Sequence, residues 1–141
     1  MGDNGIESRK YTDFTQDEIK QYLEELKQLI REGQYTISLN RNRTENVAFM
    51  EDYNIDTNKA EELLMCFEVM DFCYVVNNLK ADFAHEKLYI FCREFELDNR
   101  GDLEVVDIYM KSNLMLTRRG DKRVIIISFH KRNKPIRYCF K

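Results

Sequence analysis

Apolar residues follow a helical spacing in the first half of the chain and alternate with polar residues in the second half. Behind a capping box of Thr15 and Glu18, one apolar stripe recurs with the helical period: Ile19, Tyr22, Leu23, Leu26, Leu29 and Ile30. This spacing predicts an amphipathic helix with one buried face, and Gly33 is placed to end it.

Two shorter helices are predicted next along the chain. Residues 35–39 alternate and fit a short strand or an extended link. A helix over 44–52 is expected to stop at Asn54 in the left-handed conformation. The following helix is capped by Asp56 or Thr57, and its apolar stripe comprises Ala60, Leu63, Leu64, Phe67 and Met70.

Beyond the mainly helical residues 15–72, the alternation takes the two-residue period of β-strands. We expect a turn at 98–102, a short last segment at 136–140, and strands over 88–95, 105–116 and 122–130. Helices followed by an antiparallel meander are typical of an α+β domain. Its N-terminal helices would pack on an antiparallel sheet formed by residues 73–141.

Length and composition indicate one domain without disulfides. The 141 residues suit a single domain, in which the polar residues 1–13 are expected to be disordered. No apolar stretch is long enough to span a membrane and none follows the N-terminus, so we expect a cytoplasmic protein without membrane contact. We expect reduced, buried or half-buried thiols, and no metal or cofactor, at Cys66, Cys73, Cys92 and Cys139.

Charge is distributed unevenly along a chain whose net charge is −3. Nine of its 22 basic residues, but only one of its 25 acidic residues, lie from Arg118 to Lys141. Such a basic end fits a surface that faces a polyanion such as RNA, and it fits a strand edge kept soluble by Lys and Arg equally well. The residues expected to bind RNA are Arg118, Arg119, Arg123, Lys131, Arg132 and Arg137.

The last two predicted strands bring a set of reactive side chains onto one face. A turn centred just before Gly120 would pair Tyr109 with His130, and Lys111 with Ser128. The opposite face would bury an apolar set: Val106, Ile108, Met110, Ile125, Ile127 and Phe129.

A phenol, an imidazole, an ammonium and a hydroxyl on one face suit RNA cleavage without a metal ion. The imidazole of His130 can take the proton of an attacking 2′-hydroxyl or give one to the departing 5′-oxygen. Tyr109 suits a hydrogen-bond donor or acid, and Lys111, Arg132 and Arg137 suit neutralising the developing charge. From spacing alone, ordinary roles as a rim tyrosine, a solvated histidine and an exposed lysine are more common.

The same two strands resemble the end of toxins of the MqsR type. Those proteins close with a Tyr-x-Lys strand, a turn, and an apolar strand ending in Ser-Phe-Lys or Ser-Phe-His. Here Asp-Ile-Tyr-Met-Lys stands at 107–111 and Val-Ile-Ile-Ile-Ser-Phe-His at 124–130. Upstream, residues 23–33, 51–55 and 70–74 resemble the family's first helix and its Glu-Leu-Gly-Leu and Asp-Phe-Tyr elements.

This resemblance implies a RelE-like fold with a curved antiparallel sheet. It also implies a metal-independent endoribonuclease toxin that cuts mRNA and is partnered by an antitoxin encoded nearby. Carried over by position, Tyr109 matches the family's strand tyrosine, and His130 stands where some members have a functional lysine. The family's polar residue on the preceding strand falls at Cys92, Arg93 or Glu94, of which Arg93 best suits a phosphate.

Two departures from the family favour another interpretation. Tyr74 stands where the best-known branch has a lysine, and the chain is acidic whereas such nucleases are usually basic. The alternative is an inactive binding module on the same scaffold, such as a phage or mobile-element protein that binds RNA or inhibits a nuclease complex. Acidic helix residues would then mimic nucleic acid: Asp52, Asp56, Glu61, Glu62 and Glu68.

Overall fold

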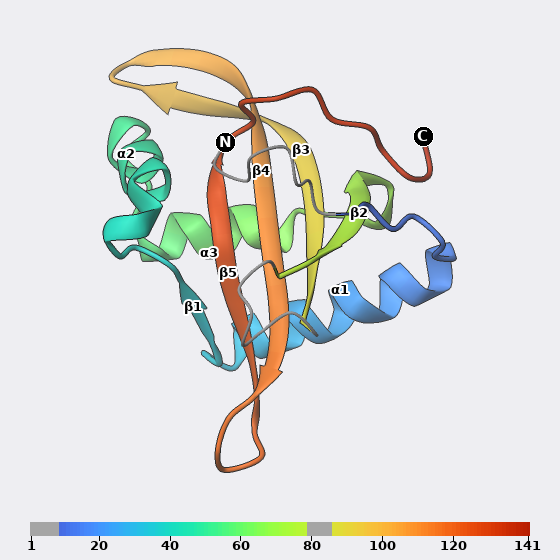
Figure 1. Cartoon of the computed structure of the whole chain (residues 1–141). Helices are drawn as coiled ribbons and strands as arrows, with labels where there is room; N and C mark the ends of the chain where they lie inside the picture. The colour runs from blue at the N-terminus through green and yellow to red at the C-terminus, as the bar shows by residue number, and fades with distance from the viewer. Residues whose placement is uncertain (1–8, 79–85) are drawn as a thin grey trace.

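The computed structural model describes residues 9–78 and 86–141, which form helices and a five-stranded sheet (Figure 1). The helices and turns are α1 (Gln16–Arg31), η1 (Arg41–Arg43), α2 (Thr44–Asp52), α3 (Thr57–Met65) and η2 (Val69–Asp71). The strands are β1 (Tyr35–Ile37), β2 (Phe72–Asn77), β3 (Lys87–Asn99), β4 (Asp102–Leu116) and β5 (Lys122–Lys131). The predicted α+β class is confirmed.

The sheet is mixed rather than antiparallel. Its strand order is β1-β5-β4-β3-β2, and β1 runs parallel to β5 while the remaining pairs are antiparallel. The prediction of an antiparallel sheet built from residues 73–141 alone is therefore wrong. The reason is that β1 lies between the helices in the sequence, and its backbone completes the open edge of β5.

Helix α1 forms where the apolar stripe predicts it. Both halves of the capping box are present: the Thr15 hydroxyl accepts from the Glu18 amide at 3.1 Å, and the Glu18 carboxylate accepts from the Thr15 amide at 2.8 Å. All six predicted stripe residues are buried. Gly33, with φ 75°, turns the chain out of the helix.

The predictions for α2 and the start of α3 are also confirmed. Helix α2 spans the expected residues, and Asn54 follows it with φ 51°. The Asp56 side chain caps α3 by accepting from the Lys59 amide at 2.8 Å. Asp56 is therefore the cap, and Thr57 is the first residue of the helix.

Helix α3 ends earlier than its apolar stripe predicts. It stops at Met65, well before residue 72, and the η2 turn leads the chain into β2. Phe67 is buried outside the helix, whereas Met70 is 39% exposed and does not belong to the buried stripe. A hydrogen bond within the η2 turn stabilises it: the backbone amide of Glu68 donates to the Asp71 carboxylate at 2.8 Å.

Strands β3 and β4 are longer than predicted. They meet in a two-residue turn of Arg100 and Gly101, with φ 55° and 98°, as in hairpin turns that match the twist of their strands. Within the described residues, β2 pairs with β3 as far as Phe91, and β5 pairs with β4 as far as Ile108. Residues 92–99 and 102–107 therefore form a two-stranded extension, the β3–β4 ribbon, at the top of Figure 1.

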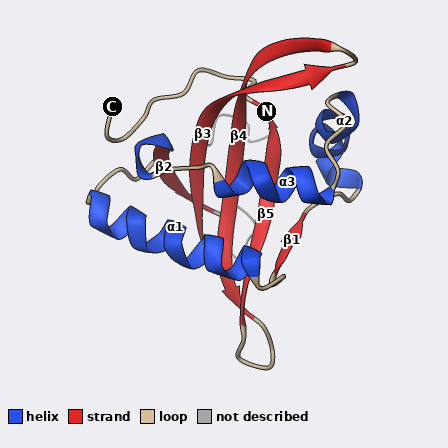
Figure 2. Ribbon diagram, turned by 180° about the vertical axis from the view of Figure 1, so that it is seen from behind, coloured by secondary structure: helices blue, strands red, loops and turns tan. Residues whose placement is uncertain are grey.

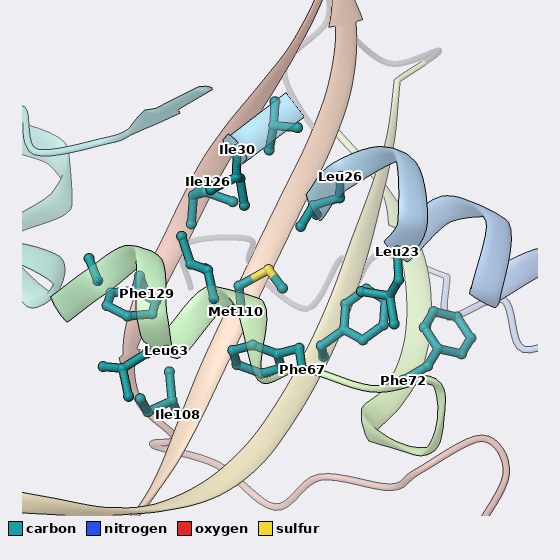
Figure 3. Close-up of a cluster of buried hydrophobic side chains, with 14 of the residues drawn as sticks. Leu23, Leu26, Ile30, Leu63, Phe67, Phe72, Ile108, Met110, Ile126 and Phe129 are labelled. Atoms are coloured by element: carbon teal, nitrogen blue, oxygen red, sulfur yellow. The ribbon is translucent and has the colours of Figure 1, made fainter. Parts of the chain in front are cut away.

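The main core lies between α1, α3 and the inner face of the sheet (Figures 2 and 3). Figure 3 shows side chains from α1, the α3 region and the strands meeting there: Leu23, Leu26, Ile30, Leu63, Phe67, Phe72, Ile108, Met110, Ile126 and Phe129. A second, smaller cluster occupies the opposite face of the sheet, which we call the outer face: Cys73, Tyr74, Val76, Leu88, Ile90, Cys92 and Tyr109.

The segment before α1 is ordered where the structure describes it. Tyr11 pairs with Val75 through two backbone hydrogen bonds of 2.8 and 2.9 Å, and the ring of Phe14 lies 5.6 Å from that of Phe72. The expectation of disorder is therefore wrong from residue 9 onward, because apolar contacts hold the segment to β2. Residues 1–8 and His85 lie outside the described residues.

The predicted cysteine states are confirmed except at Cys66. All four thiols are free, with Cys73 and Cys92 buried and Cys139 half-buried, while Cys66 is exposed at the end of α3. None of the helices in the described part of the chain is long and apolar enough to cross a lipid bilayer.

Candidate functional site on the outer face of the sheet

The register of β4 and β5 brings the predicted side chains together. Tyr109 is paired with His130 and Lys111 with Ser128, as the sequence predicts. The rings of Tyr109 and His130 are stacked, with centroids 5.5 Å apart and planes inclined by 21°. All four residues lie on the outer face, on two adjacent strands.

This pairing arises from a different turn and a β-bulge. Leu116 pairs with Lys122, so the hairpin is centred on Arg119, and near the turn the register is one residue away from the predicted one. The register then shifts between Lys111 and Ser112, where β5 contains the extra residue Ile127. The extra residue compensates for the one-residue difference in register at the turn. The predicted pairs therefore form on the far side of the bulge.

The bulge also corrects the predicted faces of β5. The core-facing residues are Val124, Ile126 and Phe129, whereas Ile127 packs against the outer cluster. The assignment of Ile125 and Ile127 to the core is therefore wrong. One extra residue reverses the alternation, so Ser128 and His130 lie on the outer face although Ile126 is buried on the inner face.

Asn46 holds the bulge in place, and sequence reasoning missed it. Its side-chain amide donates to the carbonyls of Ser38 at 2.8 Å and Ile127 at 3.0 Å, and its oxygen accepts from the Phe129 amide at 2.9 Å. Asn46 is 1% exposed. The available signal was a polar residue one turn before the apolar Phe49, on the same face of a predicted helix.

His130 is oriented so that one ring nitrogen can act as a base. Its Nδ1 lies 2.7 Å from the carbonyl oxygen of Lys131, which can only accept, so Nδ1 carries the proton of the neutral ring. Nε2 is then the proton acceptor. The Glu45 carboxylate lies 4.0 Å from Nδ1.

Lys111 is a half-buried cation among other cations. Burial, and then the positive charges of Arg43 and Lys134, lower the pKa of its ammonium group to about 8. Lys111 is therefore still mainly charged at neutral pH, and a bound anion would relieve the repulsion among the three groups. Arg43 and Lys134 were not among the predicted site residues, since they come from η1 and from the segment after β5.

Two tyrosines complete this face as neutral hydrogen-bonding groups. Burial raises the pKa of Tyr109 well above its ordinary value, so its phenol keeps its proton. Burial likewise raises the pKa of Tyr74, whose hydroxyl is buried without a hydrogen-bond partner among the described residues. The ammonium of Lys10, from the N-terminal segment, lies 4.8 Å from the ring centre of Tyr74. Tyr74 stands where the MqsR-type sequences have a lysine, so a cation lies next to that position.

The C-terminal segment, residues 132–141, crosses the outer face (Figure 1). Ile136 and Tyr138 pack against the outer cluster, and Lys134 lies 5.4 Å from the ring centre of Tyr109. The segment is tied to β2 by a 3.0 Å hydrogen bond from the Cys139 amide to the Phe72 carbonyl. Within the described chain, Tyr109 and His130 are 6% and 9% exposed.

Arg93 is not part of this group. It lies on the inner face, opposite Ile108 in the register, and its guanidinium lies 3.0 Å from both Asp71 and Glu68. Of the three alternatives on β3, Cys92 is the residue paired with Tyr109 on the outer face. Arg93 therefore stabilises the η2 turn, and we exclude it from the site.

The predicted RNA-binding residues are spread along the whole sheet. Arg118 and Arg119 are exposed in the β4–β5 turn, beyond the end of β4, which lies about 17 Å along the strand from Lys111. Arg123 is held by β1 through Thr36 and the Tyr35 carbonyl. The other three lie near the opposite end of β5. Lys131 lies over the ring of Tyr53, Arg132 pairs with Asp107, and Arg137 is exposed.

Several of the acidic helix residues proposed to mimic nucleic acid have partners within the chain. Glu61 accepts a hydrogen bond from Tyr35, Glu68 pairs with Arg93, and Asp56 caps α3. In residues 9–78 and 86–141, no three His, Cys, Asp or Glu side chains are grouped so that they could hold a metal ion.

The outer-face site therefore consists of a base-competent imidazole, a half-buried lysine with two neighbouring cations, and two protonated phenols. No family model, curated protein or solved structure matches this chain.

Proposed function

We propose that this protein is an endoribonuclease that cleaves mRNA at the outer-face site without a metal ion. The observation that carries the proposal is the placement of His130 beside Tyr109 and next to the cationic group of Lys111, Arg43 and Lys134. The resemblance to MqsR-type toxins and to a RelE-like fold supports it, and implies an antitoxin as partner.

In the proposed reaction, the RNA phosphate binds beside Lys111. Nε2 of His130 takes the proton from the 2′-hydroxyl, whose oxygen attacks the adjacent phosphorus and displaces the 5′-oxygen of the next nucleotide. The departing oxygen receives a proton from the imidazolium or from the Tyr109 phenol, which leaves a cyclic phosphate and a free 5′-hydroxyl. Lys111, Arg43 and Lys134 stabilise the charge that develops on the phosphate oxygens.

The burial of the two central rings favours a second function, an RNA-binding module without catalysis. Tyr109 and His130 are almost covered, while Lys134 and Arg137 are exposed on the C-terminal segment above them. Such a protein would bind phosphates through the cations of this face and leave the imidazole as a packing group.

The experiment is cleavage of a defined mRNA by purified protein in EDTA, beside separate measurements of RNA binding. His130→Ala and Tyr109→Phe are each expected to lower the cleavage rate by about tenfold or more and to leave binding largely intact. Lys20→Ala, on the exposed surface of α1, is the matched control and should cleave like the parent.

The two functions give different outcomes. Folded protein that binds RNA but never cuts it, with binding weakened by Lys111→Ala, would overturn the nuclease and support the binding module. Cleavage that is unchanged in both His130→Ala and Tyr109→Phe would show that the site assignment is wrong.

A further inference from the structure

The β3–β4 ribbon carries an exposed surface that the proposed site does not use. The register pairs Glu96 with Val105 and Asp98 with Leu103, so carboxylates of β3 lie beside apolar side chains of β4 on one face. Leu103 and Val105 are 68% and 66% exposed. We call Glu94, Glu96, Asp98, Leu103 and Val105 the acidic ribbon face.

The carboxylates of this face are largely unneutralised. Asp98 accepts a hydrogen bond from the Gly101 amide within the turn. Neither Glu94 nor Glu96 has an ion-pair partner in the part of the chain that the structure describes. Exposed apolar side chains rimmed by polar and charged groups mark interaction surfaces. The rim here is predominantly acidic, although the exposed Arg100 lies in the turn of the ribbon.

The opposite end of the molecule carries a surface of complementary chemistry. Met115 and Leu116 are 38% and 64% exposed beside the turn, on opposite faces of β4, and Arg118 and Arg119 follow them. Among the described residues neither arginine has an ion-pair partner, whereas the nearby Lys122 is paired with Glu25. We call Met115, Leu116, Arg118 and Arg119 the basic hairpin tip.

These two surfaces cannot meet within one chain. Strand β4 joins them, and from Val105 to Leu116 it extends about 36 Å. Figure 1 shows the ribbon and the β4–β5 turn at opposite ends of the sheet. Only a second molecule can bring the arginines of the hairpin tip, with one of its two apolar side chains, onto the carboxylates and apolar side chains of the ribbon.

We propose that the acidic ribbon face binds the basic hairpin tip of a second copy of this chain, head to tail. The contact is heterologous, because each copy offers a different surface at each end, so association continues into short chains of copies rather than stopping at a symmetric dimer. The patches are small and charged, so the association is weak and is screened by salt.

The test is sedimentation velocity of the full chain over a range of concentrations up to about 0.5 mM. The mean mass is expected to rise with concentration in about 50 mM salt and to fall toward the monomer in about 500 mM salt. Arg118→Glu with Arg119→Glu, and separately Glu94→Lys with Glu96→Lys, should each weaken association by about tenfold or more. All four positions are exposed, and circular dichroism verifies that both variants are folded.

Mixing the two variants gives the sharpest outcome. The acidic tip of the first variant complements the basic ribbon of the second, and their unaltered surfaces also match, so the mixture should associate although neither variant does alone. A parent protein that stays monomeric throughout, or a mixture that stays monomeric, overturns the proposal. So does a tip variant that loses RNA binding while associating like the parent, because that result assigns Arg118 and Arg119 to RNA.

Discussion

At the scale of single residues, Lys111 shows how burial and charge compete. Its ammonium is half-buried and lies near Arg43 and Lys134, and these effects lower its pKa to about 8. The folded protein therefore binds this proton less tightly than the unfolded chain, whose lysine titrates at the ordinary value. Retaining a proton there at neutral pH destabilises the fold, and a site that binds anions gives a physical reason for keeping the residue.

Replacing Lys111 by methionine should therefore stabilise the protein at neutral pH. We expect Lys111→Met to raise the free energy of unfolding at pH 7 by about 1–2 kcal/mol, after allowing for partial exposure. The stability of the parent should rise with pH between about 8 and 10.4, as the folded state deprotonates before the unfolded state, and the difference between the two proteins should shrink.

Urea unfolding at several pH values tests this, with the exposed Lys87→Met on β3 as the control. A methionine variant that is less stable than the parent at pH 7 would mean that the ammonium has a stabilising partner and that its pKa is not lowered.

At the scale of elements, the bulge in β5 decides which side chains reach the outer face. The sequence predicted the pairs of Tyr109 with His130 and Lys111 with Ser128, and the structure contains them. They form because the register differs from the prediction by one residue at the turn and shifts back by one residue at Ile127. Alternation alone cannot reveal a bulge, because a run of four adjacent apolar residues, 124–127, reads equally well with either face inward. The hydrogen bonds of Asn46 settle it, and they join elements far apart in the sequence.

Asn46→Ala should destabilise the fold through the bulge. The variant leaves the Ile127 carbonyl and the Phe129 amide without their partner in a buried position, so we expect a loss of about 2–4 kcal/mol in the free energy of unfolding. Chemical denaturation measures the loss. Asn58→Ala, an exposed asparagine on α3, should change stability by less than about 0.5 kcal/mol. An equal effect of both variants would contradict the role given to Asn46.

At the scale of the whole molecule, the basic C-terminal end, residues 118–141, does not form one surface. The strands and the crossing segment distribute its cations to the hairpin tip, the far end of β5 and the outer face, and several are paired with Asp107, Glu25 or β1. A net charge of −3 also gives little general attraction for RNA. Specific binding should then depend on a few cations and not on all nine.

The salt dependence of RNA binding distinguishes these cases. The logarithm of the binding constant for single-stranded RNA falls linearly with the logarithm of the salt concentration. If only Lys111, Arg43 and Lys134 contact phosphates, the slope should be about −2. Contact by all nine C-terminal cations predicts a slope of about −6. Fluorescence anisotropy between low and moderate salt measures the slope, and a value near the steeper limit would contradict a localised site.

The sequence by itself determined where the helices begin, the α+β class and the candidate outer-face residues. Capping boxes, stripes and alternation act between residues close along the chain, and they are therefore readable from it. Only the tertiary structure decided that β1 joins β5 in parallel, that Arg93 lies on the other face, and that Arg43 and Lys134 surround Lys111. Those outcomes depend on contacts between distant segments, whose register and direction no local spacing specifies.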